Sequence, residues 1–145
     1  MCLSGKNGKI ITQKYINELV YKIIGCAIEV HRHLGPGLLE SVYEKCLIEE
    51  LENSGMKVES QQNLPLYYKE KYLGNHLRLD LLVEDLIVIE LKAVELMIPV
   101  FKAQLLSHLK LSKKPKGLLI NFNCENISKQ MLQLVTTEFA KLPKE

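Results

Sequence analysis

The sequence predicts an α/β fold in which a mixed central sheet is flanked by helices. Two amphipathic stretches near the start of the chain show the three- and four-residue spacing of helices. Apolar stretches over residues 77–83, 86–94 and 117–122 have the lengths of buried strands. A helix that begins at Pro99 separates the last two strands, so the final strand can return parallel to its neighbour. The predicted order of elements is α-α-β-β-β-α-β-α.

The two N-terminal helices are predicted over residues 12–34 and 38–53. Gly35-Pro36-Gly37 separates them, because proline lacks an amide donor and glycine adopts the angles that a reversal needs. In the first helix the residues expected to face the core are Ile16, Leu19, Val20, Ile23, Ile24, Ala27 and Ile28. In the second they are Leu39, Val42, Cys46, Leu47 and Leu51. Both faces follow the helical period.

After these helices the pattern changes to that of strands. Short strands are expected around Val58 and over residues 64–68, and Gly74-Asn75 is expected to turn the chain into the long antiparallel pair. The helix from Pro99 to Leu111 should face inward with Val100, Ala103, Leu106 and Leu109. A closing helix is predicted over residues 127–139.

Length and composition indicate one domain. A chain of 145 residues fits a single core, so we expect a polar lead-in over residues 1–11 and one domain over residues 12–145. The net charge of +2 neither indicates nor excludes a polyanionic partner. The four cysteines lack the spacing of a zinc site, which favours reduced thiols, with Cys26 and Cys46 acting as core residues. No apolar run has the length of a membrane span, and a soluble, cytoplasmic protein without a membrane partner is expected.

Charged residues interrupt the long antiparallel pair. Asp80 lies in the first strand, and Glu90 and Lys92 lie in the second. Side chains alternate along a strand, so Glu90 and Lys92 share a face. Asp80 faces Glu90 only if the turn is centred on Asp85 and has an odd number of residues. A two-residue turn at Glu84-Asp85 would put the carboxylates on opposite faces.

Two carboxylates beside a lysine suit metal-assisted hydrolysis of a phosphate ester. Mg²⁺ prefers oxygen ligands, and Mn²⁺ can substitute for it. Lys92 could orient or deprotonate a metal-bound water. The pattern leaves open a plain salt bridge between Lys92 and Glu90 or Asp80 on an exposed sheet face.

Several blocks of the sequence resemble the GxxExxY family, a branch of the PD-(D/E)XK nuclease superfamily. Residues 37–43, Gly-Leu-Leu-Glu-Ser-Val-Tyr, reproduce the naming motif, and further blocks lie at residues 78–83, 89–93, 103–106 and 117–122. The resemblance covers nearly the whole chain. It implies a restriction-endonuclease-like αβββαβ core, in agreement with the predicted elements.

The resemblance also implies roles for individual residues. Asp80 and Glu90 would be metal ligands, and Lys92 would be the base that handles the water. Glu40 would complete the metal site from its helix or position the water. Gln104 would brace the catalytic site or contact nucleic acid.

The helix from Pro99 departs from the pattern at one position. Related nucleases carry a tyrosine four residues after the glutamine, where this chain has His108. His108 could donate a hydrogen bond to a phosphate, or be a surface or packing residue. Lys102 and Lys110 are candidate nucleic-acid contacts, and they cluster with Lys113, Lys114 and Lys116, although a solvated face explains the cluster equally well. Tyr43 would lie near Glu40 or be a plain core aromatic.

The expected function is a metal-dependent nuclease that hydrolyses phosphodiester bonds in DNA, with RNA as the less favoured substrate. The alternative is a non-catalytic nucleic-acid-binding or protein-interaction module that retains the nuclease fold. The sequence leaves open the strandedness of the substrate, and whether a homo-oligomer or a partner protein is needed to build a binding groove.

Overall fold

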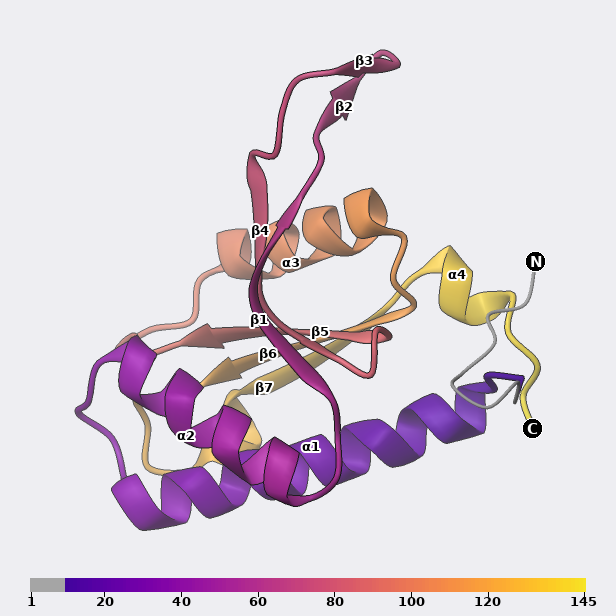
Figure 1. The fold of residues 1–145 in the computed structure, drawn as a ribbon. Coiled ribbons are helices and arrows are strands. Elements are labelled where there is room, and N and C mark those ends of the chain that lie inside the picture. Colours follow the sequence, from indigo (N-terminus) through magenta and orange to yellow (C-terminus); the bar gives the residue numbers. More distant parts are fainter. Residues whose placement is uncertain (1–9) are drawn as a thin grey trace.

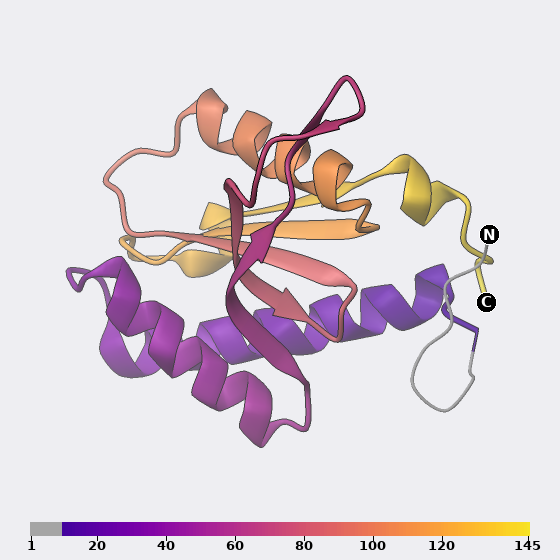
Figure 2. The same ribbon diagram turned by 45° about the horizontal axis from the view of Figure 1, so that its top comes forward.

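The computed structural model describes residues 10–145 as a five-stranded mixed sheet between two helical layers (Figure 1). Helices α1 (Gln13–Leu34) and α2 (Glu40–Asn53) cover one face, and α3 (Pro99–Ser112) covers the other. Figure 2 shows the same three layers after a turn of the molecule. The predicted fold class is confirmed. The lead-in predicted over residues 1–11 lies, except for its last two residues, outside the described part of the chain.

The sheet has the strand order β1-β4-β5-β6-β7. The strands are β1 (Val58–Leu64), β4 (Leu77–Val83), β5 (Ile87–Lys92), β6 (Lys116–Asn121) and β7 (Met131–Val135). Neighbouring strands are antiparallel except β5 and β6, which are parallel because the crossover through α3 joins them. The predicted parallel return of the strand after α3 is therefore confirmed.

The closing helix predicted over residues 127–139 is wrong. The chain instead forms a 3₁₀ turn, η2 (Ile127–Gln130), then strand β7 and the short helix α4 (Thr137–Ala140). The whole of β6 is buried, so its outer backbone groups need hydrogen-bond partners, and β7 supplies them. Leu132 and Leu134 then point to the side of the sheet that α3 covers. Pairing within the sheet overrides the helix-like spacing of this segment.

The turn predicted at Gly74-Asn75 is a bend, and the chain reverses earlier. Strands β2 (Tyr67–Tyr68) and β3 (Lys71–Tyr72) form a separate hairpin that projects from the body of the molecule in Figure 1. Its turn residues, Lys69 and Glu70, have φ angles of 48° and 66°, as a two-residue hairpin turn of the primed type requires. Neither residue is a glycine or an asparagine, so the sequence carried no turn signal there.

The inward faces of the helices differ from the predicted faces at several positions. Five apolar residues expected in the core are exposed: Ile28, Leu39, Val42, Val100 and Ala103. Two buried ones were not predicted, Val30 and Leu105, and Tyr43, for which a core position was one of two alternatives, is buried. In α3 the buried residues are Leu105 and Leu109, and both pack against Gly117 on β6. A Cβ at Gly117 would lie 2.7 Å from Leu109 Cδ1, so the glycine lets the helix approach β6 closely. None of the helices in residues 10–145 is long and apolar enough to cross a membrane.

Cysteines in the described part of the chain are free thiols, as predicted. Cys26 is buried in the main core, and Cys46 packs partly buried against it. Both therefore serve as small apolar residues. Cys2 lies outside the described residues.

Candidate active site

Asp80 and Glu90 occupy facing positions on β4 and β5. The antiparallel ladder runs up to the residue pair directly before them, and the connecting turn comprises residues 84–86. The turn is therefore centred on Asp85 and has an odd number of residues. This is the register under which the two carboxylates share one side of the sheet.

Hydrogen bonds on both sides hold the turn that sets this register. Glu84 has a positive φ of 52°; its amide donates to Lys57 O at 2.8 Å, and its Oε2 accepts from the Lys57 amide at 2.8 Å. Asp85 follows with a φ of 58° and accepts from Lys114 Nζ at 2.9 Å. The unusual backbone angles are thus supported by contacts to the residue directly before β1 and to the segment that follows α3.

The sheet forks at Asp80. Beyond this residue β4 stays paired with β1 as far as Leu77, but it no longer pairs with β5. The amide of Leu91 on β5 donates instead to Asp80 Oδ2 at 3.1 Å. The Asp80 carboxylate therefore lies where the β1–β4 ribbon leaves the sheet, a divergence that is visible in Figure 1.

Helix α3 contacts both functional candidates on β5. The Glu90 side chain is buried, at 5% exposure, and its Oε1 contacts His108 Nδ1. This contact raises the pKa of His108 above its ordinary value. Lys92 Nζ lies 4.5 Å from the centroid of the Phe101 ring. Phe101 and His108 are seven residues apart, so they share one face of α3, and His108 belongs to the site rather than to the outer surface of the helix.

Tyr43 fixes the turn that precedes Glu40. Its hydroxyl donates to Gly35 O at 2.6 Å and accepts from the Leu38 amide at 3.2 Å. Its ring is fully buried and stacks on Phe122 with the centroids 4.8 Å apart. Tyr43 is thus a core aromatic, and it also anchors the turn that delivers Glu40 as the first residue of α2.

The acidic side chains of Glu40 on α2, Asp80 on β4 and Glu90 on β5 lie close enough for their charges to interact. Burial and then the charges of Glu90 and Glu44 raise the pKa of Asp80, against a backbone hydrogen bond and Lys92, which lower it. Although Glu40 as a residue is exposed, partial desolvation of its carboxyl group and then the charge of Asp80 raise its pKa, with Lys92 again opposing. Clustered carboxylates of this kind are stabilised by a cation.

The donor set fits a hard divalent cation, although it is not gathered into a finished site. Carboxylate oxygens are the ligands that Mg²⁺ prefers. Among residues 10–145, however, no three Asp, Glu, His or Cys side chains lie close enough together to hold a metal ion as they stand. Glu90 is engaged by His108, and Glu40 is exposed. A site built from three carboxylates therefore needs these side chains to move.

Glu44 and Gln61 border the site and were not predicted. Glu44 lies one helical turn after Glu40, and its Oε1 accepts from Gln61 Nε2 at 2.8 Å. Gln61 stands opposite Asp80 in the β1–β4 register and has a positive φ of 51°. The four-residue spacing from Glu40 could have indicated Glu44. The position of Gln61 depends on strand register, which the sequence of β1 does not reveal.

The predicted nucleic-acid contacts on α3 are exposed. Gln104, Lys102 and Lys110 all reach the surface. Gln104 lies one helical turn before His108, and the side chain that contacts Glu90 is His108. The structure therefore brings Gln104 to the same region of α3 without burying it in the site.

The lysines that follow α3 do not form one surface. Lys113 is exposed at the end of the helix, whereas Lys114 pairs with Asp85 at 2.9 Å. Lys116 is buried, with Nζ 5.2 Å from the centroid of the Phe139 ring. Burial lowers the pKa of Lys116. Neither alternative for the cluster, phosphate contact or a solvated face, fits Lys116, because it is buried and its ammonium group faces a ring.

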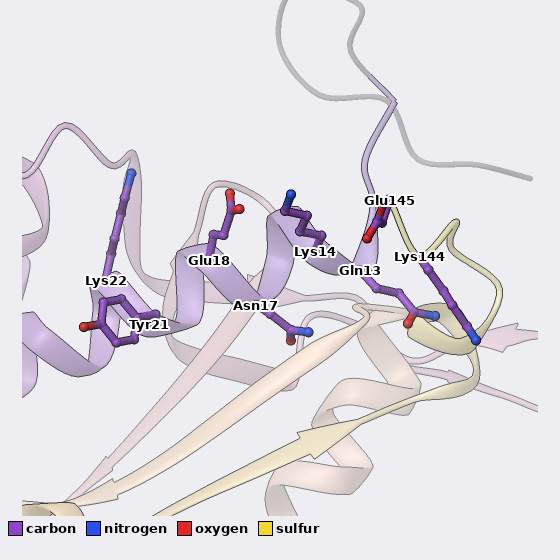
Figure 3. A pocket seen from close by; sticks show the side chains of 8 residues that line it. All are labelled: Gln13, Lys14, Asn17, Glu18, Tyr21, Lys22, Lys144 and Glu145. Atoms are coloured by element: carbon purple, nitrogen blue, oxygen red, sulfur yellow. The ribbon is translucent and has the colours of Figure 1, made fainter.

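A surface hollow lies at the other end of the molecule. It is lined by Gln13, Lys14, Asn17, Glu18, Tyr21, Lys22, Lys144 and Glu145. Figure 3 shows these side chains spread along the helix and the C-terminal residues rather than converging on one point. Glu40 follows the far end of this 22-residue helix, so the hollow is remote from the candidate site. It contains none of the predicted site residues.

The layered sheet and its forked central strands define the chain as a restriction-endonuclease-like α/β domain. The sequence profile of the PD-(D/E)XK nuclease superfamily matches residues 17–134, and the chain belongs to this superfamily. Nucleases of this superfamily generally depend on a divalent metal.

Two further comparisons bear on the fold. No curated protein matches the sequence. Among solved structures, the crystal structure of SSO0001 is similar, with a TM-score of 0.50 and 19% sequence identity over 70% of this chain. The chain spans 55% of that structure's own length. At this identity the similarity supports the fold alone.

Proposed function

We propose that the chain is a divalent-metal-dependent nuclease that hydrolyses phosphodiester bonds in DNA, and that it is of the GxxExxY type. Its place in a nuclease superfamily supports the reaction class. The observation that carries the proposal is the facing of Asp80 and Glu90 at the fork of the sheet. Lys92 follows Glu90 by two residues and therefore projects from the same face of β5.

The carboxylates form the proposed metal site. Asp80 and Glu90 are the principal ligands, and Glu40 completes the site from α2. Mg²⁺ is the expected ion, with Mn²⁺ as its substitute. When bound, the ion would polarise the scissile phosphate and lower the pKa of a water molecule. The raised pKa values of Asp80 and Glu40 support this assignment, because the charge of Lys92 does not offset desolvation and the neighbouring carboxylates.

The remaining residues act on the water and on the substrate. Lys92, held against the ring of Phe101, orients the attacking water and takes part in its proton transfer. Gln104 braces the site or contacts the nucleic acid. Lys102 and Lys110 are exposed on the same helix, where they contribute positive charge toward phosphates.

Cleavage assays test this proposal directly. Plasmid and single-stranded DNA are incubated with the protein in Mg²⁺, in Mn²⁺ and in a chelator, and cleavage is expected only with metal. Lys92→Ala should lower the rate by about 10²- to 10⁴-fold, the usual contribution of a proton-transfer group. Asp80→Ala should abolish cleavage, whereas Lys22→Ala, an exposed lysine on α1, serves as the control. Activity that survives both active-site substitutions would overturn the assignment.

One observation favours the non-catalytic module as a rival function. Within residues 10–145 no three ligands are already gathered for a metal ion. Calorimetric titration with Mg²⁺ and Mn²⁺ separates the two functions. Binding that Asp80→Ala removes supports the nuclease, and an absence of binding by the unaltered protein supports the module.

A further inference from the structure

Three exposed tyrosines gather on the hairpin formed by β2 and β3, residues 67–72, which we name the hairpin arm. Tyr67, Tyr68 and Tyr72 are 59%, 62% and 53% exposed. Exposed aromatic residues in such number mark an interaction surface. Between residues 60 and 79 the chain carries one acidic residue, Glu70, against three basic ones: Lys69, Lys71 and Arg78. The hairpin arm therefore combines aromatic rings with positive charge.

One face of the hairpin arm is used to hold it together. Tyr67 and Tyr72 are cross-strand partners whose ring centroids lie 5.5 Å apart. The Tyr72 hydroxyl donates to Asn75 Oδ1 at 2.9 Å. A two-stranded hairpin is marginally stable by itself, so this face has a structural role.

The opposite face is available for a ligand. Tyr68 pairs across the strands with Lys71, and Lys69 Nζ lies 5.5 Å from the centroid of the Tyr68 ring. An exposed ring that can stack on a base, with ammonium groups beside it for the flanking phosphates, is the arrangement found in single-strand-binding proteins.

The hairpin arm continues the ribbon that leaves the sheet at Asp80. Nine residues separate Asp80 from Lys71, which corresponds to at most about 30 Å of extended chain. Figures 1 and 2 show the hairpin arm on the same side of the sheet as α3, the side toward which Glu90 points. Even at the duplex rise of roughly 3.4 Å per nucleotide, a strand with one phosphate at Asp80 reaches the hairpin arm within about nine nucleotides.

We propose that Tyr68, Lys69 and Lys71 bind an unpaired segment of the substrate strand close to the phosphate that is cleaved. This proposal rests on the nuclease function. The segment is unpaired because stacking in a duplex hides the base faces that Tyr68 would contact. A second copy of the chain fits less well, because it would bring two positively charged arms together.

Binding of a labelled single-stranded 20-mer tests the role of the ring. Fluorescence anisotropy is measured with Mg²⁺ in the full chain carrying Lys92→Ala, which slows cleavage during the measurement. Tyr68→Val should weaken binding by about 5-fold to 100-fold, the loss expected for one stacked base. Tyr68→Phe retains the ring and should bind within about 2-fold of the parent. Tyr21→Val is the matched control, because Tyr21 on α1 is 81% exposed and remote from the hairpin arm.

Salt dependence tests the role of the lysines. The double variant Lys69→Asn with Lys71→Thr should reduce the slope of log Kd against log salt by about 1.4, from about 0.7 for each phosphate contact. Asparagine tolerates the positive φ of position 69, and threonine suits a strand, so the hairpin is preserved. Lys22→Gln is the control and should leave the slope unchanged.

A blunt 20-base-pair duplex hides its base faces by stacking, so it should bind equally with and without Tyr68→Val. The proposal is overturned if Tyr68→Val binds the 20-mer as tightly as its parent, or weakens the single strand and the duplex to the same extent. It is also overturned if Tyr68→Val converts a dimer into a monomer. If the unaltered protein cleaves nothing but still binds through Tyr68, the nuclease function fails and the role of the hairpin arm stands.

Discussion

At the scale of single residues, Tyr43 joins the core to the candidate site. Its ring is buried against Phe122, and its hydroxyl bridges the two ends of the turn between α1 and α2. The spacing of Glu40 and Tyr43 in the motif thereby acquires a structural reason. The tyrosine lies one helical turn inside α2 and holds the turn from which Glu40 emerges.

Tyr43→Phe isolates this hydroxyl. The stacked ring remains, but Gly35 O and the Leu38 amide lose their partner, so the free energy of unfolding should fall by about 1–2 kcal/mol. Glu40 should also be held less firmly, and the affinity for Mg²⁺ should decrease. Urea denaturation and calorimetry measure the two effects. Tyr21→Phe, at an exposed position, should change neither, and a Tyr43→Phe protein with unchanged stability would contradict the assigned role.

At position 108 this chain has a histidine where the family pattern has a tyrosine, and the histidine lies in the candidate site. Its imidazole contacts Glu90 from α3. The pattern alone left a surface or packing role open, because Glu90 and His108 are 18 residues apart and are brought together by the packing of α3 on β6. The absence of a side chain at Gly117 permits that close packing.

At the scale of elements, two local rules reduced the placement of Asp80 and Glu90 to a choice between two turn lengths. Side chains alternate along a strand, and the length of the turn then decides which residues face each other. The two-residue alternative at Glu84-Asp85 was excluded only by the structure, in which contacts with Lys57 hold Glu84 in a left-handed conformation.

Strand β7 and the turn of the hairpin arm could not be predicted from local pattern. The apolar residues of β7 also fit a helical period, and the segment becomes a strand because the edge of β6 requires a partner. The turn at Lys69-Glu70 lacks the glycine or asparagine that ordinarily marks positive φ. In both places tertiary contacts, or a conformation unusual for the residue type, determine the outcome.

The C-terminus of α3 offers a test of such an unusual conformation. Lys113 caps the helix in the left-handed region, with φ 56° and ψ 36°, and its amide donates to Leu109 O. Lys113→Gly should raise the free energy of unfolding by about 1 kcal/mol, because glycine adopts this conformation without steric cost. Lys110→Gly, at a helical position in the last turn, should lower it by up to about 1 kcal/mol. Thermal and urea unfolding measure both, and a destabilised Lys113→Gly protein would contradict the assigned cap.

At the scale of the whole molecule, the fork concentrates negative charge where the sheet divides. Burial, reinforced by neighbouring carboxylates, raises the pKa of Asp80 and of Glu40. The ionised cluster therefore lowers the stability of the metal-free fold, as is common for groups arranged for function rather than for packing. A bound divalent ion should reverse this effect, because it binds the folded state alone.

Asp80→Asn tests this relation between stability and function. Without metal, the substitution should raise the free energy of unfolding at pH 8 by roughly 0.5–2 kcal/mol, because it removes one charge and leaves an oxygen to accept from Leu91. In excess Mg²⁺ the unaltered protein should become the more stable of the two, since it alone gains binding energy from the ion. Thermal unfolding is measured with a chelator and with Mg²⁺. Glu59→Gln on β1 provides a control carboxylate.

The stabilisation of the metal-free protein by Asp80→Asn should depend on pH. A carboxyl whose folded pKa is raised binds more protons folded than unfolded, so its contribution to stability is complete below its ordinary pKa near 4 and is lost as pH rises through the raised value. The metal-free advantage of Asp80→Asn should therefore be greatest at pH 8 and shrink as the pH falls and Asp80 itself takes up a proton. An advantage that stays constant across this range would show that charge at the fork is not its cause.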